Sequence, residues 1–80
     1  MFNFSVREAK YLSDYRIWLK FYDESEGEID LSNYLSGEIF EPLKLVSYFK
    51  NFTVARSTIT WENGADFAPE FLYDLVSDSR

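Results

Sequence analysis

Apolar residues occupy every second position from Phe2 to Val6, which is the pattern of a half-buried β-strand. The alternation then slips by one position, because the next apolar residues are Ala9 and Tyr11. One extra residue in the strand, a β-bulge near Arg7–Glu8, accounts for the slip. The sequence therefore predicts a bulged strand at the start of the chain.

The segment Arg16–Tyr22 alternates most regularly. Its odd-numbered positions are apolar and point toward a core, and its even-numbered positions point the other way. The two sets are Ile17, Leu19 and Phe21, and Arg16, Trp18, Lys20 and Tyr22. A polar loop, Asp23–Gly27, follows, and the alternation resumes over Glu28–Leu31. This arrangement predicts a β-hairpin with a five-residue loop.

The middle of the chain has helical signals. Ser32 is suited to cap a short helical turn. Pro42 suits the first turn of a longer helix, where its missing N–H costs nothing. Asn51 is suited to a left-handed stop for this helix. The expected buried stripe of the helix is Leu43, Val46 and Phe49, with Leu45 beside them.

The last third of the chain combines two short strands with a helix. We expect strands over 52–54 and 58–62, followed by a type I′ turn at Asn63-Gly64. Pro69 opens the final helix. Its apolar stripe is Phe71, Leu72, Leu75 and Val76.

These elements predict an α+β fold: one small antiparallel sheet of four to five strands, with two short helices packed mainly on one face. We expect residues 1–80 to form a single compact domain, with 77–80 as a frayed tail. Sixteen aromatic residues supply the dense core that so short a chain needs. The expected core is Phe4, Ile17, Leu19, Phe21, Ile29, Leu31, Phe49, Ile59, Phe71, Leu72 and Leu75.

Histidine and cysteine are both absent. The commonest general base, the best nucleophile and the usual zinc ligands are therefore missing together. We expect no catalytic residue, no cofactor and no metal, and hence no enzyme. The lack of cysteine favours a reducing, cytoplasmic location, and no apolar run approaches the length of a membrane span.

The acidic run Asp23–Asp30 has three interpretations: a calcium loop, a solvated hairpin loop and an acidic docking patch. An EF-hand needs Gly at its sixth position and Glu at its twelfth. Counted from Asp23, Gly27 is fifth and Tyr34 is twelfth. The spacing therefore favours the solvated loop over the calcium loop.

The net charge of −6 argues against binding to nucleic acid by this chain alone, because that binding depends on neutralising phosphates. A local patch of Lys44, Lys50 and Arg56 leaves a single contact open. An acidic chain favours a basic protein as its partner.

The candidate interface is Trp18, Lys20 and Tyr22, which share one side of their strand. If the helices cover only the other face, the two aromatic residues lie on an open face, where exposed aromatic clusters often mark interfaces. The alternative is that a helix or the terminal segment covers them. The same patch could serve a protein partner or a homodimer.

The segment Trp61–Asp66 looks like a motif. We expect a structural role, in which Trp61 ends a strand, Asn63 and Gly64 turn the chain, and Asp66 accepts backbone N–H groups.

The chain resembles the small bacterial family known as domain of unknown function 2442. The matching stretches are Ile29–Leu35, Gly37–Leu43 and Thr58–Asp66, leading to Pro69-Glu70 and Leu72-Tyr73. Glu62 departs from the family pattern, which often has Pro between the Trp and the Asn. The resemblance implies a compact α+β domain with a small antiparallel sheet, and no particular reaction.

Members of the family look like stand-alone proteins or fusions to a helix-turn-helix domain, and some lie beside another small protein in an arrangement similar to toxin–antitoxin pairs. We expect no DNA-binding appendage here. Our hypothesis is a non-catalytic protein-interaction module, antitoxin-like or regulatory. The alternative is a small-molecule-sensing regulatory domain.

Overall fold

The larger sheet has three antiparallel strands across the part of the chain that the computed structural model describes, residues 4–78. They are β1 (Val6–Ser13), β2 (Arg16–Phe21) and β3 (Glu26–Asp30), in that spatial order. A second sheet pairs β4 (Thr53–Ala55) with β5 (Thr58–Thr60). The fold is therefore α+β, but the expected single sheet of four to five strands is wrong.

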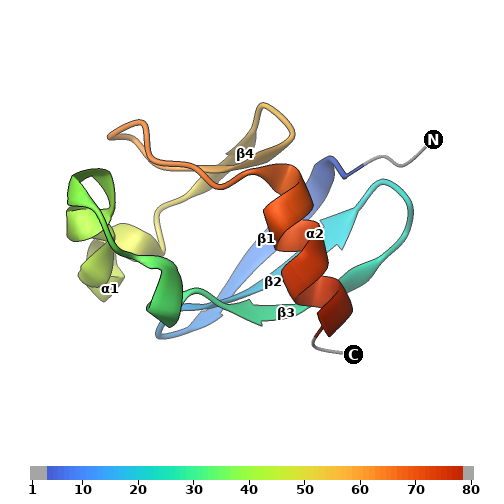
Figure 1. The fold of residues 1–80 in the computed structure, drawn as a ribbon, viewed down its shortest axis with the longest axis horizontal. Helices are drawn as coiled ribbons and strands as arrows, with labels where there is room; N and C mark the ends of the chain where they lie inside the picture. The colour runs from blue at the N-terminus through green and yellow to red at the C-terminus, as the bar shows by residue number, and fades with distance from the viewer. Residues whose placement is uncertain (1–3, 79–80) are drawn as a thin grey trace.

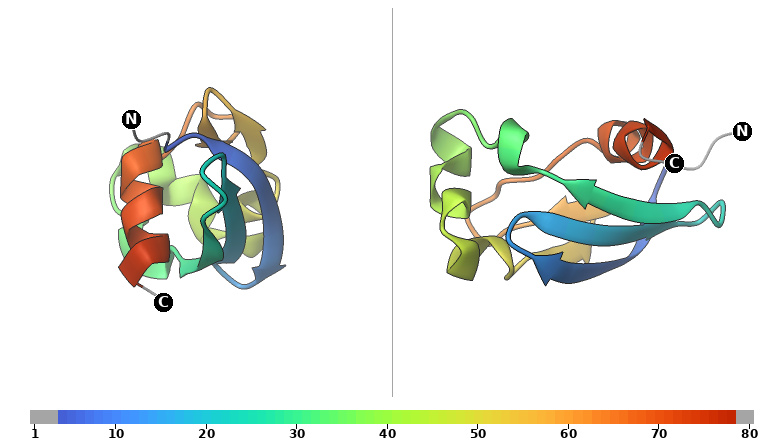
Figure 2. Two further views of the ribbon diagram at one scale, coloured as in Figure 1. Left: turned by 90° about the vertical axis from the view of Figure 1, so that its right-hand side faces the viewer. Right: turned by 90° about the horizontal axis from the view of Figure 1, so that it is seen from below.

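Four helical segments complete the described chain. Two are 3₁₀ helices, η1 (Ser32–Tyr34) and η2 (Glu38–Lys44), and two are α-helices, α1 (Val46–Phe49) and α2 (Pro69–Asp78). α2 lies on one side of the larger sheet, as two perpendicular views show (Figure 2). η2 and α1 lie beyond one end of that sheet (Figure 1).

The first strand begins later than expected. β1 starts at Val6, whereas Phe2 and Asn3 lie outside the described residues. The predicted bulge is confirmed, because the register of β1 against β2 shifts between Val6 and Glu8. A bulge bends and twists its strand. The Val6 amide N–H donates to the Ser57 carbonyl at 2.9 Å. After the bulge, β1 pairs with β2 and does not pair with the β4–β5 hairpin. The two sheets therefore meet near the bulge through this hydrogen bond but remain separate.

The hairpin of β2 and β3 confirms the predicted alternation. Ile17, Leu19 and Phe21 are fully buried, and Ile29 and Leu31 join them. The loop is shorter than predicted, because β3 already begins at Glu26. The turn after β3 is also held differently from the expected Ser32 cap: the Asp30 carboxylate accepts the Ser32 backbone N–H at 2.9 Å.

The predicted helix from Pro42 is wrong in its bounds and in part of its stripe. Leu45 is extended (φ −84°, ψ 120°) and separates η2 from α1. The break rotates the chain, so Leu43 and Phe49 are buried while Leu45 and Val46 are exposed. Asn51 is not left-handed. Its side-chain amide donates to the Ser47 carbonyl instead.

The described core is one cluster that joins both sheets, η2, α1 and α2. Of the expected core residues, Phe4, Phe71 and Leu75 are only half-buried. Further buried residues are Val6, Leu35, Leu43, Trp61, Ala65, Phe67 and Val76. The helix α2 extends through Asp78, so Ser77 and Asp78 do not belong to a frayed tail, and 79–80 lie outside the described residues.

Candidate functional site

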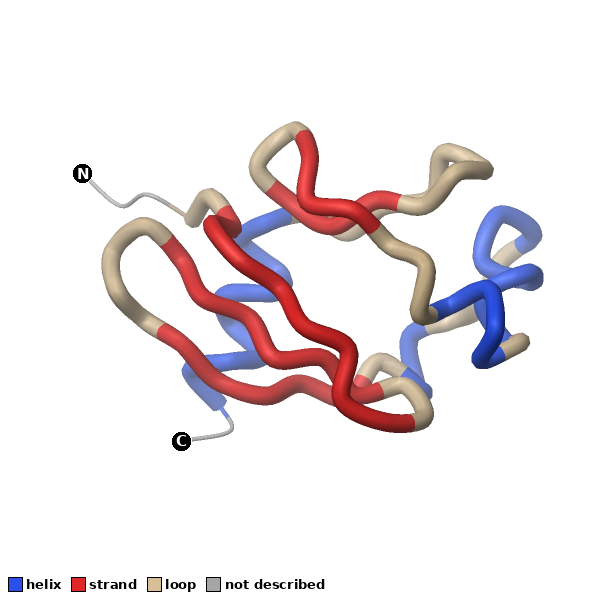
Figure 3. Tube along the Cα trace, turned by 180° about the vertical axis from the view of Figure 1, so that it is seen from behind, coloured by secondary structure: helices blue, strands red, loops and turns tan. Residues whose placement is uncertain are grey.

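The face of the three-stranded sheet that points away from α2, here called the outer face, is not covered by any described element. Seen from behind, all three strands lie in front of α2 (Figure 3). Alternation along the strands places the even-numbered side chains of β2 on this face. They are Arg16, Trp18 and Lys20, and Tyr22 follows directly after the strand.

The register places neighbours beside these side chains in cross-strand rows. Lys10, Trp18 and Glu28 form one row, and Glu8, Lys20 and Glu26 form the next. A third row pairs Arg16 with Asp30. Every row therefore ends on an acidic side chain of β3.

Trp18 lies at the centre of the outer face and is half-buried. The ammonium group of Lys10 lies 5.5 Å from the centroid of its ring, which is a cation–π contact. The Lys10 side chain therefore shields part of the indole, and no helix within residues 4–78 lies on this face of the sheet. Such a long charged side chain can move aside when a partner binds, because its head is held only at the surface.

Lys20 and Tyr22 follow Trp18 along the chain, toward the hairpin loop. The Lys20 ammonium lies 3.5 Å from the Glu24 carboxylate and 3.8 Å from that of Glu26. Tyr22 has 57% of its surface exposed, and its backbone N–H donates to the Ser5 carbonyl at 3.2 Å. Trp18 and Lys20 thus lie along one side of β2, and Tyr22 follows directly after the strand.

The acidic residues are divided between the loop and β3. In the loop, the Glu24 carboxylate forms an ion pair with the Arg7 guanidinium at 3.3 Å. On β3, Glu28 forms an ion pair with Arg16. Hydrogen bonds from the Ser32 backbone and side chain, with the nearby Arg16 charge, hold the pKa of Asp30 below its ordinary value of 3.8, although partial burial opposes the shift. Asp30 is therefore ionised at neutral pH.

Sequence reasoning missed that β3 carries its own column of acidic side chains. The sequence pattern predicts Glu26 in the loop, whereas it is the first residue of β3. The polar–apolar alternation of Glu26–Asp30, with Gly27 and Ile29 between the acidic residues, was the signal that could have identified the column.

The segment around Trp61 joins the region after β5 to η2 and α1. The Trp61 indole N–H donates to the Phe49 carbonyl at 2.7 Å, and the ring is 4% exposed. The Asn63 amide donates to the Ile39 carbonyl at 2.8 Å, and its oxygen accepts the Ala65 N–H at 3.0 Å. These contacts hold η2 and α1 against the β5 region.

Two details of this turn differ from expectation. Only Gly64 has positive φ (92°), and the Gly64 N–H donates to the Trp61 carbonyl, so the turn is type I followed by a left-handed glycine rather than type I′. Asp66 is exposed and forms a β-bridge with Thr60. The hydrogen-bonding role that we expected of the Asp66 side chain belongs to Asn63.

No group of three or more acidic residues suited to hold a metal ion occurs within residues 4–78. Among the same residues, no helix is long and apolar enough to cross a membrane.

The family comparison covers both the outer face and the Trp61 segment. A model of the family described as "Protein of unknown function (DUF2442)" matches residues 6–77. The chain belongs to the DUF2442 family. The same chain has no match among curated proteins or among solved structures. The DUF2442 match spans every strand and most of α2, so the family pattern applies to the whole fold described above.

Proposed function

We propose that this DUF2442 chain is a non-catalytic protein-interaction module that binds another protein through the outer face of its three-stranded sheet. The observation that carries the proposal is the position of Trp18: it is half-buried at the centre of a sheet face that α2 leaves open. Interfaces draw most of their binding energy from a few central aromatic or arginine anchors surrounded by polar residues.

The charge of the chain supports a basic partner. The net charge is −6, and each cross-strand row of the outer face ends on an acidic residue of β3. Complementary charge speeds encounter and makes association sensitive to salt. The finer proposal is an antitoxin-like or regulatory role beside another small protein, as the family resemblance implies. A cytoplasmic location is proposed from the lack of cysteine.

A small-molecule-sensing role is the second candidate. A groove of about 620 Å³ beside β3 favours it, since ligand pockets have similar volumes. The groove is open to solvent along the sheet edge, whereas ligand pockets bury most of their ligand. An extended segment of a protein therefore fits it better than a compact molecule.

Capture of a partner from the native host, followed by reconstitution with the purified partner, tests the proposal. We expect a stoichiometric complex with the wild-type chain, and Trp18→Ala should weaken it by about 30-fold, as expected for a hot-spot residue worth about 2 kcal/mol. Leu45→Ala is the matched control, because Leu45 is 66% exposed but lies at the far end of the molecule.

The circular-dichroism spectrum and melting temperature of Trp18→Ala show whether the variant folds. If it does not, Tyr22→Ala provides the same test at a more exposed position. Equal affinity of the wild-type chain and both outer-face variants for the partner would refute the proposal. Assembly of the chain with itself, lost in the same variants, would assign the face to a homodimer.

A further inference from the structure

β3 is a terminal strand of the larger sheet. Within residues 4–78, β2 is its only strand partner. Such an edge is a template for a further strand unless the protein protects it. β1, at the opposite edge, has two register irregularities and the β4–β5 hairpin nearby, whereas the pairing of β3 with β2 runs without a shift over five residues.

The hydrogen bonds at both ends of the hairpin show which peptide groups face the edge. The Phe21 N–H donates to the Ser25 carbonyl at 2.8 Å, and the Leu31 N–H donates to the Tyr15 carbonyl at 2.9 Å. In an antiparallel pair, alternate residues bond to the neighbouring strand. Odd-numbered residues of this segment therefore bond to β2, and the peptide groups of Glu26 and Asp30 face away from it.

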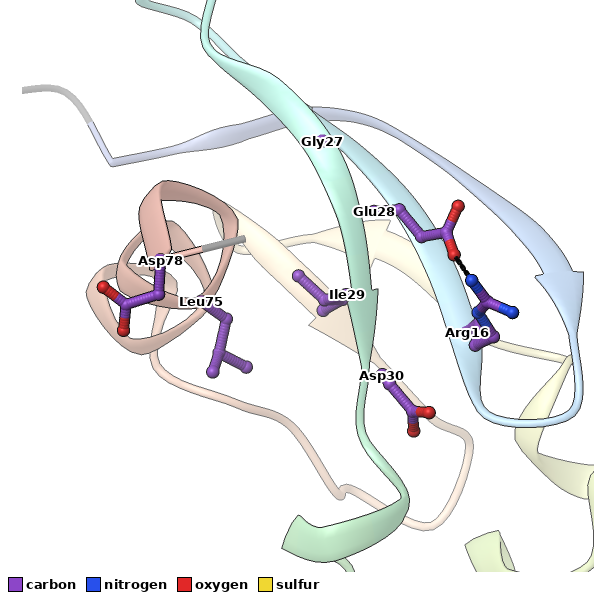
Figure 4. Close-up of a pocket in the computed structure, with 7 residues that line it drawn as sticks. All are labelled: Arg16, Gly27, Glu28, Ile29, Asp30, Leu75 and Asp78. Atoms are coloured by element: carbon purple, nitrogen blue, oxygen red, sulfur yellow. Dashed lines mark ion pairs between the residues drawn. The ribbon is translucent and has the colours of Figure 1, made fainter. Parts of the chain in front are cut away.

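A groove follows this edge. Its lining includes Glu28 and Asp30 from the outer-face side of β3 and Ile29 from the inner side, together with Leu75 and Asp78 of α2. The close-up shows Ile29 and Leu75 between the strand and the helix, and Glu28 with its partner Arg16 on the opposite side of the strand (Figure 4). The groove therefore offers an added strand apolar contacts with Ile29 and Leu75 on the α2 side. On the outer-face side it offers the carboxylates of Glu28 and Asp30, with Arg16 paired to Glu28.

The charges of the outer face alternate from strand to strand. In the row Glu8–Lys20–Glu26 the charges are negative, positive and negative from β1 to β3. In the row of Arg16 and Asp30, the charge is likewise positive on β2 and negative on β3. Opposite charges directly across neighbouring strands stabilise a sheet. The next side chain in each row, beyond β3, would complete the pattern if it were basic.

We propose that the partner adds one extended segment to the edge of β3, as a fourth strand in the groove beside α2. This inference rests on the proposed interaction function and names how the partner binds. The segment alternates basic and apolar residues, because successive side chains point to opposite faces. Its basic side chains lie opposite Glu26 and Asp30, and its apolar side chains contact Ile29 and Leu75.

A second copy of the chain fits the edge poorly. Antiparallel pairing of β3 with itself about Glu28 would place Glu26 opposite Asp30 of the copy, and Glu28 opposite its own equivalent. Like charges directly opposite one another destabilise a sheet. The acidic column therefore opposes self-association and leaves the edge to a basic strand.

Peptides provide the direct test. The probe is a seven-residue peptide that alternates Lys and Val, titrated into the isotope-labelled full chain and followed by amide resonances. We expect shifts and slowed hydrogen exchange at the amides of Glu26 and Asp30, with little change in β4 and β5. Two control peptides carry N-methyl groups on the lysine amides or on the valine amides, with the charge unchanged.

Backbone pairing predicts that one methylation pattern abolishes binding and the other is tolerated, because the amides of only one set face β3. The lysine pattern abolishes binding if the strands are antiparallel, and the valine pattern does so if they are parallel. Binding that survives both patterns, or shifts spread over the whole surface, would show charge attraction alone and overturn the inference.

Charge variants of the chain distinguish the effect of the acidic residues on β3 from the effect of overall net charge on peptide binding. Glu26→Gln with Asp30→Asn should weaken peptide binding by about three- to tenfold. The matched control is Glu38→Gln with Glu62→Gln, which removes the same charge at exposed positions away from the groove. Equal loss in the two double variants would overturn the inference.

The two proposals fail differently. Suppose that Trp18→Ala weakens binding of the natural partner, but the peptide does not shift the amides of β3 and the charge variant does not weaken peptide binding. The edge inference is then wrong and the interaction function stands. If the chain binds the peptide at β3 but no protein partner requires the outer face, the proposed function is wrong.

Discussion

Trp61 shows how one side chain connects distant parts of this fold. Its indole N–H bonds to the Phe49 carbonyl, and its ring contacts three other aromatic rings. The centroid distances are 5.7 Å to Phe49, 6.2 Å to Phe52 and 5.9 Å to Phe67. A buried Trp needs a partner for its N–H, so this position combines packing with a specific hydrogen bond. Trp61 therefore contributes to the packing of the fold and holds the Phe49 carbonyl.

Leu19 is the residue through which the strand phase can be tested. It is fully buried on the inner side of β2. Leu19→Ala should lower the free energy of unfolding by about 2–5 kcal/mol, because apolar contacts are lost and a cavity remains. Chemical denaturation measures the change. Leu12→Ala, at a position that is 44% exposed, should have a much smaller effect, and similar losses for both would contradict the burial described here.

Asp30 links stability to pH. Its folded pKa is lowered, chiefly by hydrogen bonding to Ser32, so its contribution to stability is present above the ordinary value of 3.8 and is lost as the pH falls through the folded pKa. Asp30→Asn should therefore be less stable than the wild-type chain near neutral pH, and the difference should shrink as the pH falls below 3.8 and through the lowered pKa of folded Asp30. Melting temperatures of both chains across this range measure it. A difference that persisted in acid would mean that the charged form plays no part.

At the scale of the elements, the alternating strands could be predicted, whereas the types of the turns and the bounds of the helix after Pro42 could not. The β2–β3 hairpin follows from a period of two that agrees with burial at Ile17, Leu19, Phe21 and Ile29. The helix after Pro42 failed because apolar periodicity does not reveal the extended backbone at Leu45. The two sheets meet where Val6, beside the bulge of β1, bonds to Ser57, a contact between segments far apart in sequence.

The turn between β4 and β5 has an unexpected sequence. Arg56 and Ser57 have φ values of 54° and 71°, the left-handed pair that a two-residue hairpin turn requires. Such residues lose about 1–2 kcal/mol in this conformation. Arg56→Asn with Ser57→Gly should stabilise the chain by about 1 kcal/mol, after the added flexibility of the unfolded chain is subtracted.

Thermal or chemical unfolding measures this gain. Arg56→Gln is the control, since it removes the charge but keeps a residue unsuited to positive φ. If the control stabilises the chain as much as the double variant, charge rather than backbone conformation is responsible.

Gly64 should tolerate no β-branched residue. Its φ is 92°, and a Cβ at this position would meet no atom within 4 Å, so the cost of substitution lies in the backbone and not in a clash. Gly64→Val should destabilise the fold by at least about 1 kcal/mol. Glu62→Val, at an exposed neighbour with negative φ, is the control in denaturation experiments. If the glycine variant were as stable as the control, the turn would not depend on left-handed backbone.

At the scale of the whole molecule, the arrangement of layers decides which surface is available. α2 covers the inner side of the larger sheet, η2 and α1 lie beyond its end, and the outer face stays open (Figures 1 and 2). The sequence indicated that Trp18, Lys20 and Tyr22 share one side of a strand, because alternation is local. It could not indicate that β3 is an edge strand, since strand order is a property of the assembled sheet.

The charge distribution follows the same logic. A net charge of −6 can be counted from the sequence, but the acidic column on β3 requires the register with β2. Lys10 over Trp18 likewise joins β1 to β2. Both features depend on the pairing of neighbouring strands, which places these side chains beside one another.

The central claim is that a partner protein binds the outer face and the edge of β3. Amide hydrogen exchange of the complete chain, with and without its purified partner, tests this claim most directly, because exchange reports protection segment by segment. We predict slowed exchange in residues 16–30 and unchanged exchange in residues 53–60 when the partner is bound. Protection confined to residues 53–60, or none in residues 16–30 at saturating partner, would contradict the account.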